Sequence, residues 1–203
     1  TFRRVIKGWE KTMGFIDYYK DTSTIKKTSW DDNAGKALIY DKDPRHPVLN
    51  FDKIEKKMSA VFHCNLRRSC DAYVEKNGMR YLIEFKNQSD GNIDGTEIRD
   101  KIYDSIALLS LNESIPRKAL AERTVAIVVY NNNKHIPDKS SAAPSPAIDK
   151  FTRTLKTYAD KKDLDSYPKK FLMNCFIGKL IHNAYTVDVE VFQNEIMPMV
   201  FGK

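Results

Sequence analysis

Two carboxylates and a lysine stand in a pattern that could hold a metal ion beside a reacting phosphate. The stretch SCDAYVEKNGMRYLIEFKNQ contains Asp71, Glu84 and Lys86, with Asn77-Gly78 between the two acids. Asn-Gly is the strongest short signal for a two-residue β-hairpin turn, because both residues tolerate the positive φ of a type I′ turn. Such a hairpin sets Asp71 directly opposite Glu84, where like charges repel. The pattern therefore requires a compensating positive charge.

The same turn predicts the register of the hairpin and sorts its side chains onto two faces. One face is apolar and is expected to pack on helices: it carries Cys70, Ala72, Val74, Tyr81, Ile83 and Phe85. The other face carries the acids, with Asp71, Tyr73, Glu75, Arg80, Leu82, Glu84 and Lys86. A slip by one residue would scramble the apolar face, so the register that opposes the two acids is strongly specified.

A divalent cation would remove the repulsion between the two acids. Cross-strand Cβ atoms lie about 4.5–5.5 Å apart, so two opposed carboxylates can share one ion. Mg²⁺ binds one or two carboxylates and keeps several waters, which leaves positions for a substrate phosphate. Lys86 projects from the same face and could hold a water, assist its deprotonation or offset charge on a phosphate. These residues favour a Mg²⁺ or Mn²⁺ site for phosphate chemistry.

A helix is expected on each side of the hairpin. Asn50 can cap a helix over 51–62, and Thr96 can cap a second helix over 97–111. The inward faces of these helices are expected to be Phe51, Ile54, Met58 and Val61, and Ile98, Ile102, Ser105, Ile106 and Leu109, respectively.

The run TVAIVVY, residues 124–130, predicts a strand that is buried on both faces. A strand, a helix and a second buried strand in that order suggest a parallel crossover. If the two strands run parallel, the end of the second one lies at the sheet edge near Lys86.

The acids and the lysine resemble the motif of the PD-(D/E)XK nuclease superfamily, which has the restriction-endonuclease-like fold. The resemblance covers about residues 50–130, where helix, hairpin, helix and buried strand follow one another as in that family's core. It implies an α/β fold with a central mixed sheet whose hairpin is flanked by helices. Cys70 stands where the name of the motif has proline, a position that the family keeps loosely.

The resemblance also implies roles for single residues. Asp71 and Glu84 would bind the metal, the backbone carbonyl of Phe85 would add a ligand, and Lys86 would assist the nucleophile. Members of the family often add a carboxylate from the preceding helix. Glu55 is the best placed residue for that role here, although a solvated helix charge would look the same.

Further side chains are candidates that also have ordinary explanations. Gln88 shares the face of the acids and could position water or phosphate, or it could be a polar strand end. Arg80, Arg99, Tyr103 and Lys134 could contact nucleic acid, although surface solvation explains each of them as well.

The two ends of the chain lie outside the resemblance. The N-terminal range is rich in polar and turn-forming residues before the first helix and is expected to be an appendage. We therefore expect an appendage over 1–49 and a nuclease-like domain over 50–203, with a polar loop over 131–147, and a basic helix and strands within 148–203, the strands over 171–177 and 184–192.

Composition sets only broad limits. The chain has 34 Lys and Arg against 27 Asp and Glu, a net charge of +7, which is compatible with a polyanionic partner. Three cysteines in no close pair favour a reducing, cytoplasmic compartment over a disulfide framework. No apolar run reaches membrane-spanning length, so no membrane partner is expected.

The expected function is a Mg²⁺-dependent nuclease that hydrolyses phosphodiester bonds, with DNA as the expected partner. A homodimer is compatible with this function, because cutting of two strands often uses two sites. One alternative keeps the fold without turnover, as a nucleic-acid-binding or protein-interaction module. Another is a different metal-dependent hydrolase or phosphotransfer fold in which the hairpin is incidental. The intact set of two acids and a lysine favours the enzyme.

Overall fold

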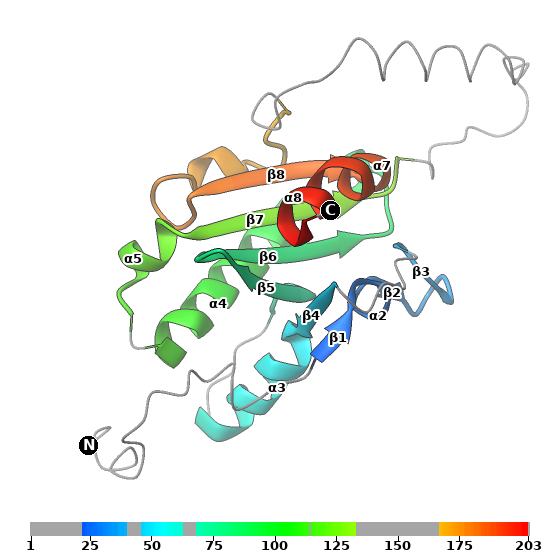
Figure 1. Cartoon of the computed structure of the whole chain (residues 1–203). Coiled ribbons are helices and arrows are strands. Elements are labelled where there is room, and N and C mark those ends of the chain that lie inside the picture. Colours follow the sequence, from blue (N-terminus) through cyan, green and yellow to red (C-terminus); the bar gives the residue numbers. More distant parts are fainter. Residues whose placement is uncertain (1–21, 40–45, 63–67, 114, 133–166, 203) are drawn as a thin grey trace, which may run out of the picture.

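The computed structural model of the chain describes residues 22–39, 46–62, 68–113, 115–132 and 167–202 (Figure 1). Its centre is a six-stranded sheet in the order β1-β4-β5-β6-β7-β8. Neighbouring strands pair antiparallel from β1 to β6, whereas β6, β7 and β8 run parallel. The expected mixed central sheet with helices on it is therefore confirmed.

The elements have the following bounds. The sheet contains β1 (Thr22–Thr24), β4 (Pro47–Asn50), β5 (Ala72–Lys76), β6 (Met79–Lys86), β7 (Thr124–Tyr130) and β8 (Asn183–Asp188), and a separate pair is formed by β2 (Trp30–Asp31) and β3 (Lys36–Ala37). The helices are α2 (Ile25–Thr28), α3 (Phe51–Phe62), α4 (Gly95–Glu113), α5 (Arg117–Ala121), α7 (Val189–Val191) and α8 (Met197–Phe201), with the π-helical η6 (Phe192–Ile196) between the last two and short 3₁₀ turns at η2 (Asp90–Asn92) and η5 (Met173–Cys175).

Part of the range expected as an N-terminal appendage belongs to the sheet. β4 pairs with β5, and β1 pairs with β4. Ile25 of α2 packs in the same core cluster as Ala72 and Ile83 of the hairpin. The expected boundary after residue 49 falls within β4, so the described residues before it extend the fold beyond the hairpin.

The hairpin has the register that its turn predicts. Ala72 pairs with Ile83 at the far end of the ladder. Asn77 and Gly78 have φ angles of 53° and 73°, as a type I′ turn requires. Because β5 begins at Ala72, Asp71 lies just beyond the last pair of the ladder.

The register predicts that Cys70 shares the apolar face of Ala72, but this prediction is wrong. It is buried and packs in the cluster that holds Tyr73 and Ile98. The ladder ends at Ala72, and the Cys70 N–H donates instead to Ser105 Oγ of α4 at 2.9 Å. Strict alternation therefore does not extend past the end of the strand.

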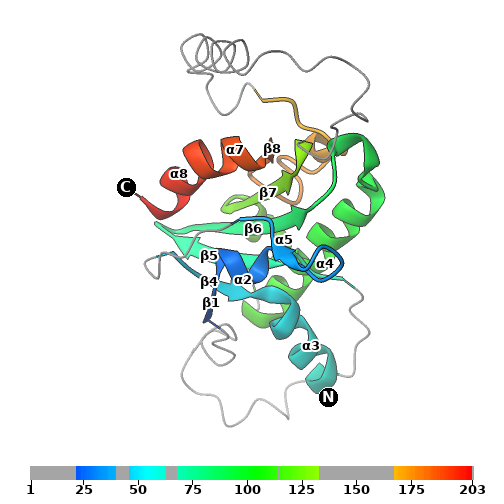
Figure 2. The ribbon, with the colours of Figure 1, turned by 90° about the vertical axis from the view of Figure 1, so that its right-hand side faces the viewer.

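Helices cover both faces of the sheet, with α3 and α4 on one side and α7 and α8 on the other (Figure 2). The expected stripe of α4 is confirmed, since Ile98, Ile102, Ser105, Ile106 and Leu109 are each at most 1% exposed. This stripe packs with Leu82 of β6 and Val128 of β7. The face of the hairpin that bears the acids is therefore covered by α4, and its charges have to be neutralised inside the protein.

β7 confirms the expected buried strand and its direction. Every residue of β7 is buried, and Lys86 stands beside Tyr130 in a parallel register. The C-terminal ends of β6, β7 and β8 therefore meet at one edge of the sheet, towards β2 and β3 in Figure 1.

The helix starts agree with one of the two expected caps. Asn50 Oδ1 accepts from the Lys53 N–H at 3.0 Å, as expected for the first helix. The second helix begins at Gly95, and Asp94 Oδ1 accepts from the Thr96 N–H at 2.8 Å. The cap is therefore Asp94 and not Thr96, which already lies within the helix.

The expected C-terminal strands need correction. Phe171 and Leu172 have φ angles of 58° and 57°, which a strand cannot contain, and η5 follows them, so 171–177 is a turn region. β8 ends at Asp188, whose carboxylate accepts from the Val191 N–H at 2.9 Å and starts α7. The range 184–192 is thus half strand and half helix, while Lys134, most of the 131–147 loop and the expected basic helix lie outside the described residues.

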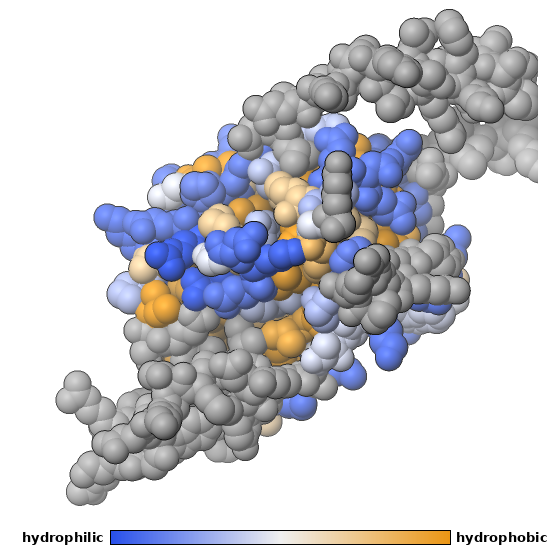
Figure 3. Space-filling view, in the orientation of Figure 1, coloured by the Kyte–Doolittle hydropathy of each residue, from blue (hydrophilic) through white to orange (hydrophobic). Residues whose placement is uncertain are grey.

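Hydrophilic residues are spread over the face that carries α7 and α8, with hydrophobic residues between them (Figure 3). Within the described ranges, no helix combines the length and the apolar character needed to cross a bilayer.

Gly78→Ala should destabilise the fold by about 1 kcal/mol, because a side chain at positive φ costs roughly that much. Nothing lies within 4 Å of the position that the new Cβ would take, so the cost is conformational and not steric. Gly91→Ala is the matched control, since the space around it is equally open and its φ is not positive. Urea denaturation measures both variants, and equal stabilities would contradict the type I′ turn.

Candidate active site

Asp71 is held in place by main-chain hydrogen bonds at the end of the hairpin ladder. Its carbonyl accepts from the Phe51 N–H at 3.1 Å, and its Oδ2 accepts from the Phe85 N–H at 2.6 Å. A longer ladder would pair Phe85 with Cys70. The Asp71 carboxylate therefore accepts the Phe85 N–H hydrogen bond that the backbone of residue 70 would accept in a longer ladder. This bond fixes the position of Asp71 relative to β6.

Glu84 is buried at the centre of a charge cluster. Its side chain is 1% exposed, and its Oε1 lies 2.7 Å from Lys101 Nζ and 3.3 Å from Lys86 Nζ. Its Oε2 is buried and has no hydrogen-bond partner among the residues that the structure describes. Both ammonium groups thus act on one carboxylate oxygen, while the lone pairs of the other oxygen remain uncommitted.

Lys101 supplies the positive charge that the opposed acids require. Its Nζ also lies 3.5 Å from Asp71 Oδ1, so that one ammonium group contacts both carboxylates. Sequence reasoning missed this residue. The available signal was its place three residues after Ile98 and four before Ser105, on the inward stripe of α4, where a lysine needs a buried partner.

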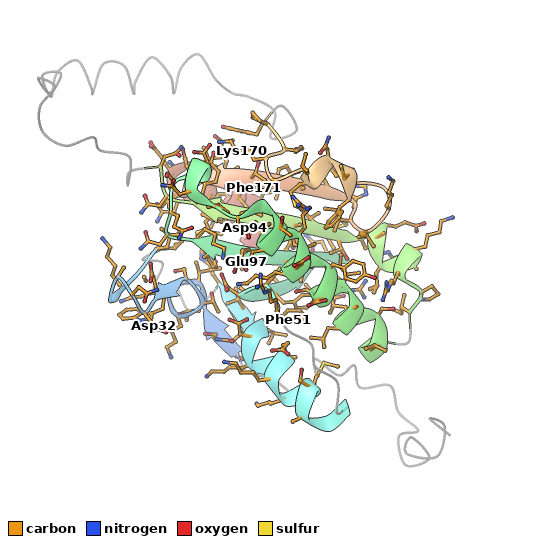
Figure 4. All side chains as sticks on the ribbon, turned by 180° about the vertical axis from the view of Figure 1, so that it is seen from behind. Asp32, Phe51, Asp94, Glu97, Lys170 and Phe171 are labelled. Atoms are coloured by element: carbon orange, nitrogen blue, oxygen red, sulfur yellow. The ribbon has the colours of Figure 1, made fainter. Side chains whose placement is uncertain are left out.

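Lys86 joins the cluster to the first turn of α4. Its Nζ lies 2.9 Å from Glu97 Oε1, in addition to its contact with Glu84. Figure 4 shows Glu97 and Asp94 at the N-terminal end of α4, over the end of the sheet. The Lys86 ammonium is therefore positioned by two carboxylates from different elements.

Burial shifts the acids towards their protonated forms. Burial, followed by repulsion from Asp71, raises the pKa of Glu84 to about 8, although Lys101 and Lys86 oppose this rise. Burial also raises the pKa of Asp71 to about 6, against the attraction of Lys101 and with added repulsion from Asp52. Burial disfavours the charged form of Lys101, but Glu84 and Asp71 outweigh it and raise the pKa of this lysine.

A cavity of about 570 Å³ opens beside the cluster. Asp71, Phe85 and Lys86 line it from the hairpin. Further lining comes from α2 and the β2–β3 pair, including Lys27, Trp30, Asp31 and Asp32, and Asp52, Asn87 and Gln88 also line the cavity. The two acids thus differ in access, because Asp71 faces the cavity and Glu84 lies behind it.

The helix before the hairpin contributes a carboxylate to this cavity, but from Asp52. This residue lines the cavity, and its Oδ1 accepts from Ser69 Oγ at 2.7 Å. The sequence candidate Glu55 is 9% exposed, and its Oε1 accepts from Ser59 Oγ at 2.6 Å within the same helix. Asp52 therefore lines the site, whereas Glu55 does not. Asp52 could have been found from its place in the first turn of the helix, which lies next to the sheet.

Gln88 lies at the site, whereas Arg80 does not. Gln88 is exposed and lines the cavity two residues beyond the end of β6. Arg80 stands four positions before Glu84 on β6, about 13 Å away along the strand, and is 9% exposed.

The other nucleic-acid candidates have structural partners or fall outside the described residues. Arg99 donates to the Phe171 carbonyl at 3.0 Å and so ties α4 to the turn after residue 170. Tyr103 is 42% exposed, and its hydroxyl accepts from Arg117 at 2.7 Å. Lys134 lies outside the described residues.

The donor set fits a divalent cation with open positions. Asp71 and Glu84 offer two carboxylates, one of which has the buried Oε2 without a partner. The Phe85 carbonyl points to the same side as its N–H, towards Asp71, because both groups of a strand residue face one neighbour. Among the described residues, no three His, Cys, Asp or Glu side chains form a metal-binding group, so water or substrate would have to complete the coordination.

Comparison of the chain with protein-family models, with curated proteins and with solved structures finds no match.

The pH dependence of stability tests the burial of Glu84. A raised pKa in the folded state contributes stability that is present at low pH and is lost as the pH rises towards about 8. Glu84→Gln removes this loss, so its melting temperature relative to the wild type should rise between pH 5 and pH 9 in EDTA. Thermal melts at both pH values measure the difference.

Glu97→Gln is the control for this experiment. Burial opposes ionisation of Glu97, but the hydrogen bond from Lys86 and the nearby lysines keep its pKa below the usual value. Its melting-temperature difference from the wild type should therefore stay flat between pH 5 and pH 9. A flat difference for Glu84→Gln as well would mean that Glu84 is ionised throughout this range.

Proposed function

We propose that the chain is a Mg²⁺-dependent nuclease with a restriction-endonuclease-like core, which hydrolyses phosphodiester bonds in DNA. One observation carries the proposal: Asp71 and Glu84 share Lys101 at the end of the hairpin, Lys86 lies beside Glu84, and a buried oxygen of Glu84 has no partner within the described part of the chain. A buried acceptor without a donor is costly, and a cation would satisfy it.

The charge of the cavity also supports a metal-dependent reaction. Four aspartates line it, namely Asp31, Asp32, Asp52 and Asp71, against the two lysines Lys27 and Lys86. A phosphate that entered this cavity alone would meet an excess of negative charge. A divalent cation bound first at the carboxylate pair would offset that excess.

The residues of the chain would divide the work as follows. Asp71, Glu84 and the Phe85 carbonyl would hold the ion, which would polarise the phosphate and stabilise the charge that develops on it. Lys86 would donate hydrogen bonds to the phosphate or to the attacking water, and Glu97 would keep the ammonium oriented. Lys101 would favour the ionised forms of both carboxylates, against the burial that raises their pKa values.

Lys101 would compete with the metal ion for the two carboxylates. Its ammonium contacts the same two carboxylates that would bind the ion. The free Glu84 Oε2 allows a cation to bind without displacing the lysine from Oε1. Lys101 would therefore balance charge within the cluster and would not assist the nucleophile.

Lys86→Ala should lose cleavage by about 100-fold or more, because a positioned proton donor typically contributes that much. It should keep the Mg²⁺-induced rise in melting temperature, since the carboxylates remain. Lys86→Arg should rescue activity poorly, because a planar guanidinium cannot replace a compact ammonium between two acids. The assay uses labelled DNA and RNA, single-stranded and duplex, with Mg²⁺ or Mn²⁺.

EDTA and the exposed-lysine variant Lys118→Ala are the controls for this assay. EDTA should abolish cleavage, and Lys118→Ala should cleave like the wild type. Near-normal cleavage by Lys86→Ala would remove this lysine from the mechanism.

Binding separates the enzyme from the alternative of an inactive nuclease-like module. The Lys86→Ala protein should bind DNA more tightly with Mg²⁺ than in EDTA, because the ion offsets most of the negative charge of the cavity. Its affinity should fall with salt, as expected when phosphates release counterions. Equal affinity in EDTA would favour a nucleic-acid-binding module, and no binding to any nucleic acid would favour a protein-interaction module.

A further inference from the structure

Trp30 differs from the other exposed apolar residues by its place. It is 51% exposed and lines the same cavity as Asp71 and Lys86. Among the described residues, the other large exposed hydrophobic side chains, Tyr103, Leu111, Leu172 and Met199, do not line this cavity. Single exposed apolar residues are ordinary on a protein surface. Trp30 is distinguished by its place in the cavity and by the anchoring of the backbone on both sides of it.

The backbone around Trp30 is fixed to the body of the protein. Its neighbour Asp31 accepts from the Asn33 and Ala34 N–H groups at 2.9 and 3.1 Å through Oδ1. Its Oδ2 accepts from Asn87 Nδ2 at 2.7 Å, just beyond the end of β6. Asn87 in turn accepts from Asn131 Nδ2 at 2.8 Å, at the end of β7.

The preceding residue anchors the other side of the β2–β3 pair. Ser29 is buried, its carbonyl accepts from the Leu38 N–H at 2.8 Å, and its Oγ accepts from the Ile39 N–H at 3.0 Å. Trp30 therefore stands between two anchored residues, which fix its backbone relative to the end of β6. An indole on a fixed backbone has only two side-chain torsions, so it loses little entropy when it stacks on a ligand.

We infer that Trp30 is the stacking platform for an unpaired base of a single-stranded DNA segment whose phosphate lies at Asp71 and Lys86. This inference rests on the proposed function. A base inside a duplex already has both faces covered by its neighbours, so only an unpaired or extruded base can stack on the indole. Lys27, on the same cavity wall, has the charge to contact a flanking phosphate.

The charges around Trp30 are compatible with this ligand. Asp31 is engaged by Asn87 and by two main-chain N–H groups, which disperse its negative charge. Figure 4 shows Asp32 on the β2–β3 pair, apart from Glu97 and the end of α4. A neutral aromatic surface next to a cation site thus separates base recognition from phosphate recognition.

The test measures binding without cleavage, on phosphorothioate oligonucleotides with Mg²⁺. Trp30→Ala should weaken binding of a single-stranded oligonucleotide by about tenfold, while binding of a blunt duplex of the same length should change less than about twofold. Trp30→Phe should restore most of the lost affinity, because a phenyl ring still stacks. Leu111→Ala, which removes an exposed apolar side chain outside the cavity, should bind like the wild type.

Fluorescence gives a direct readout of stacking. The chain has two tryptophans, Trp9 and Trp30, so Trp9→Phe leaves Trp30 as the sole tryptophan, whose emission is excited selectively at wavelengths that tyrosine does not absorb. Single-stranded DNA should quench this emission, and a blunt duplex should not. Equal loss of affinity for both DNA forms in Trp30→Ala, or unchanged emission on binding, would overturn the inference.

The outcomes separate this inference from the proposed function. Mg²⁺-dependent cleavage in the wild type with unchanged single-strand binding in Trp30→Ala would keep the nuclease and reject the platform. Trp30-dependent binding without cleavage of any nucleic acid would keep the platform and reject the nuclease.

Discussion

The burial of Glu84 beneath α4 is the constraint on which the rest of the site depends. Asp71 lies just past the end of the hairpin ladder and contacts the same lysine as Glu84, while the apolar stripe of α4 covers the face of the sheet that carries Glu84. A carboxylate that is 1% exposed has to be protonated, paired or bound to a cation. Lys101 on α4 pairs with both acids, so the helix that buries the charges also brings the charge that balances them.

The cluster has more negative than positive groups close to its centre, and this excess of negative charge favours binding of a further cation. Burial raises the pKa values of both acids, with added repulsion from Asp71 on Glu84 and from Asp52 on Asp71, whereas a structural ion pair would usually lower them. Perturbed acids beside a cavity are typical of functional sites. In the proposed function, the Oε2 of Glu84, which has no partner among the described residues, would accept the cation.

The site is assembled at the edge where the parallel strands end and where the N-terminal residues return to the sheet. The position of Asp71 is fixed by the hydrogen bond from Phe85 at the end of the hairpin ladder, and Lys86 is the last residue of β6. The position of the Trp30 backbone is fixed by the hydrogen bond between Asp31 of β2 and Asn87. Each wall of the cavity therefore comes from a different part of the chain. This arrangement separates the buried charges from the surface that would receive a ligand.

The sequence by itself determined the hairpin, its turn and its register, because Asn77-Gly78 and strict alternation are local rules. It also predicted the stripe of α4 and the parallel direction of β7, since both follow from periodicity and chain order. Only the tertiary structure decided that Lys101 pairs with the acids, that Asp52 and not Glu55 lines the cavity, and that Trp30 lines the same cavity as Asp71. These contacts join residues far apart in sequence, and their partners are set by how α3, α4 and β2 pack on the sheet.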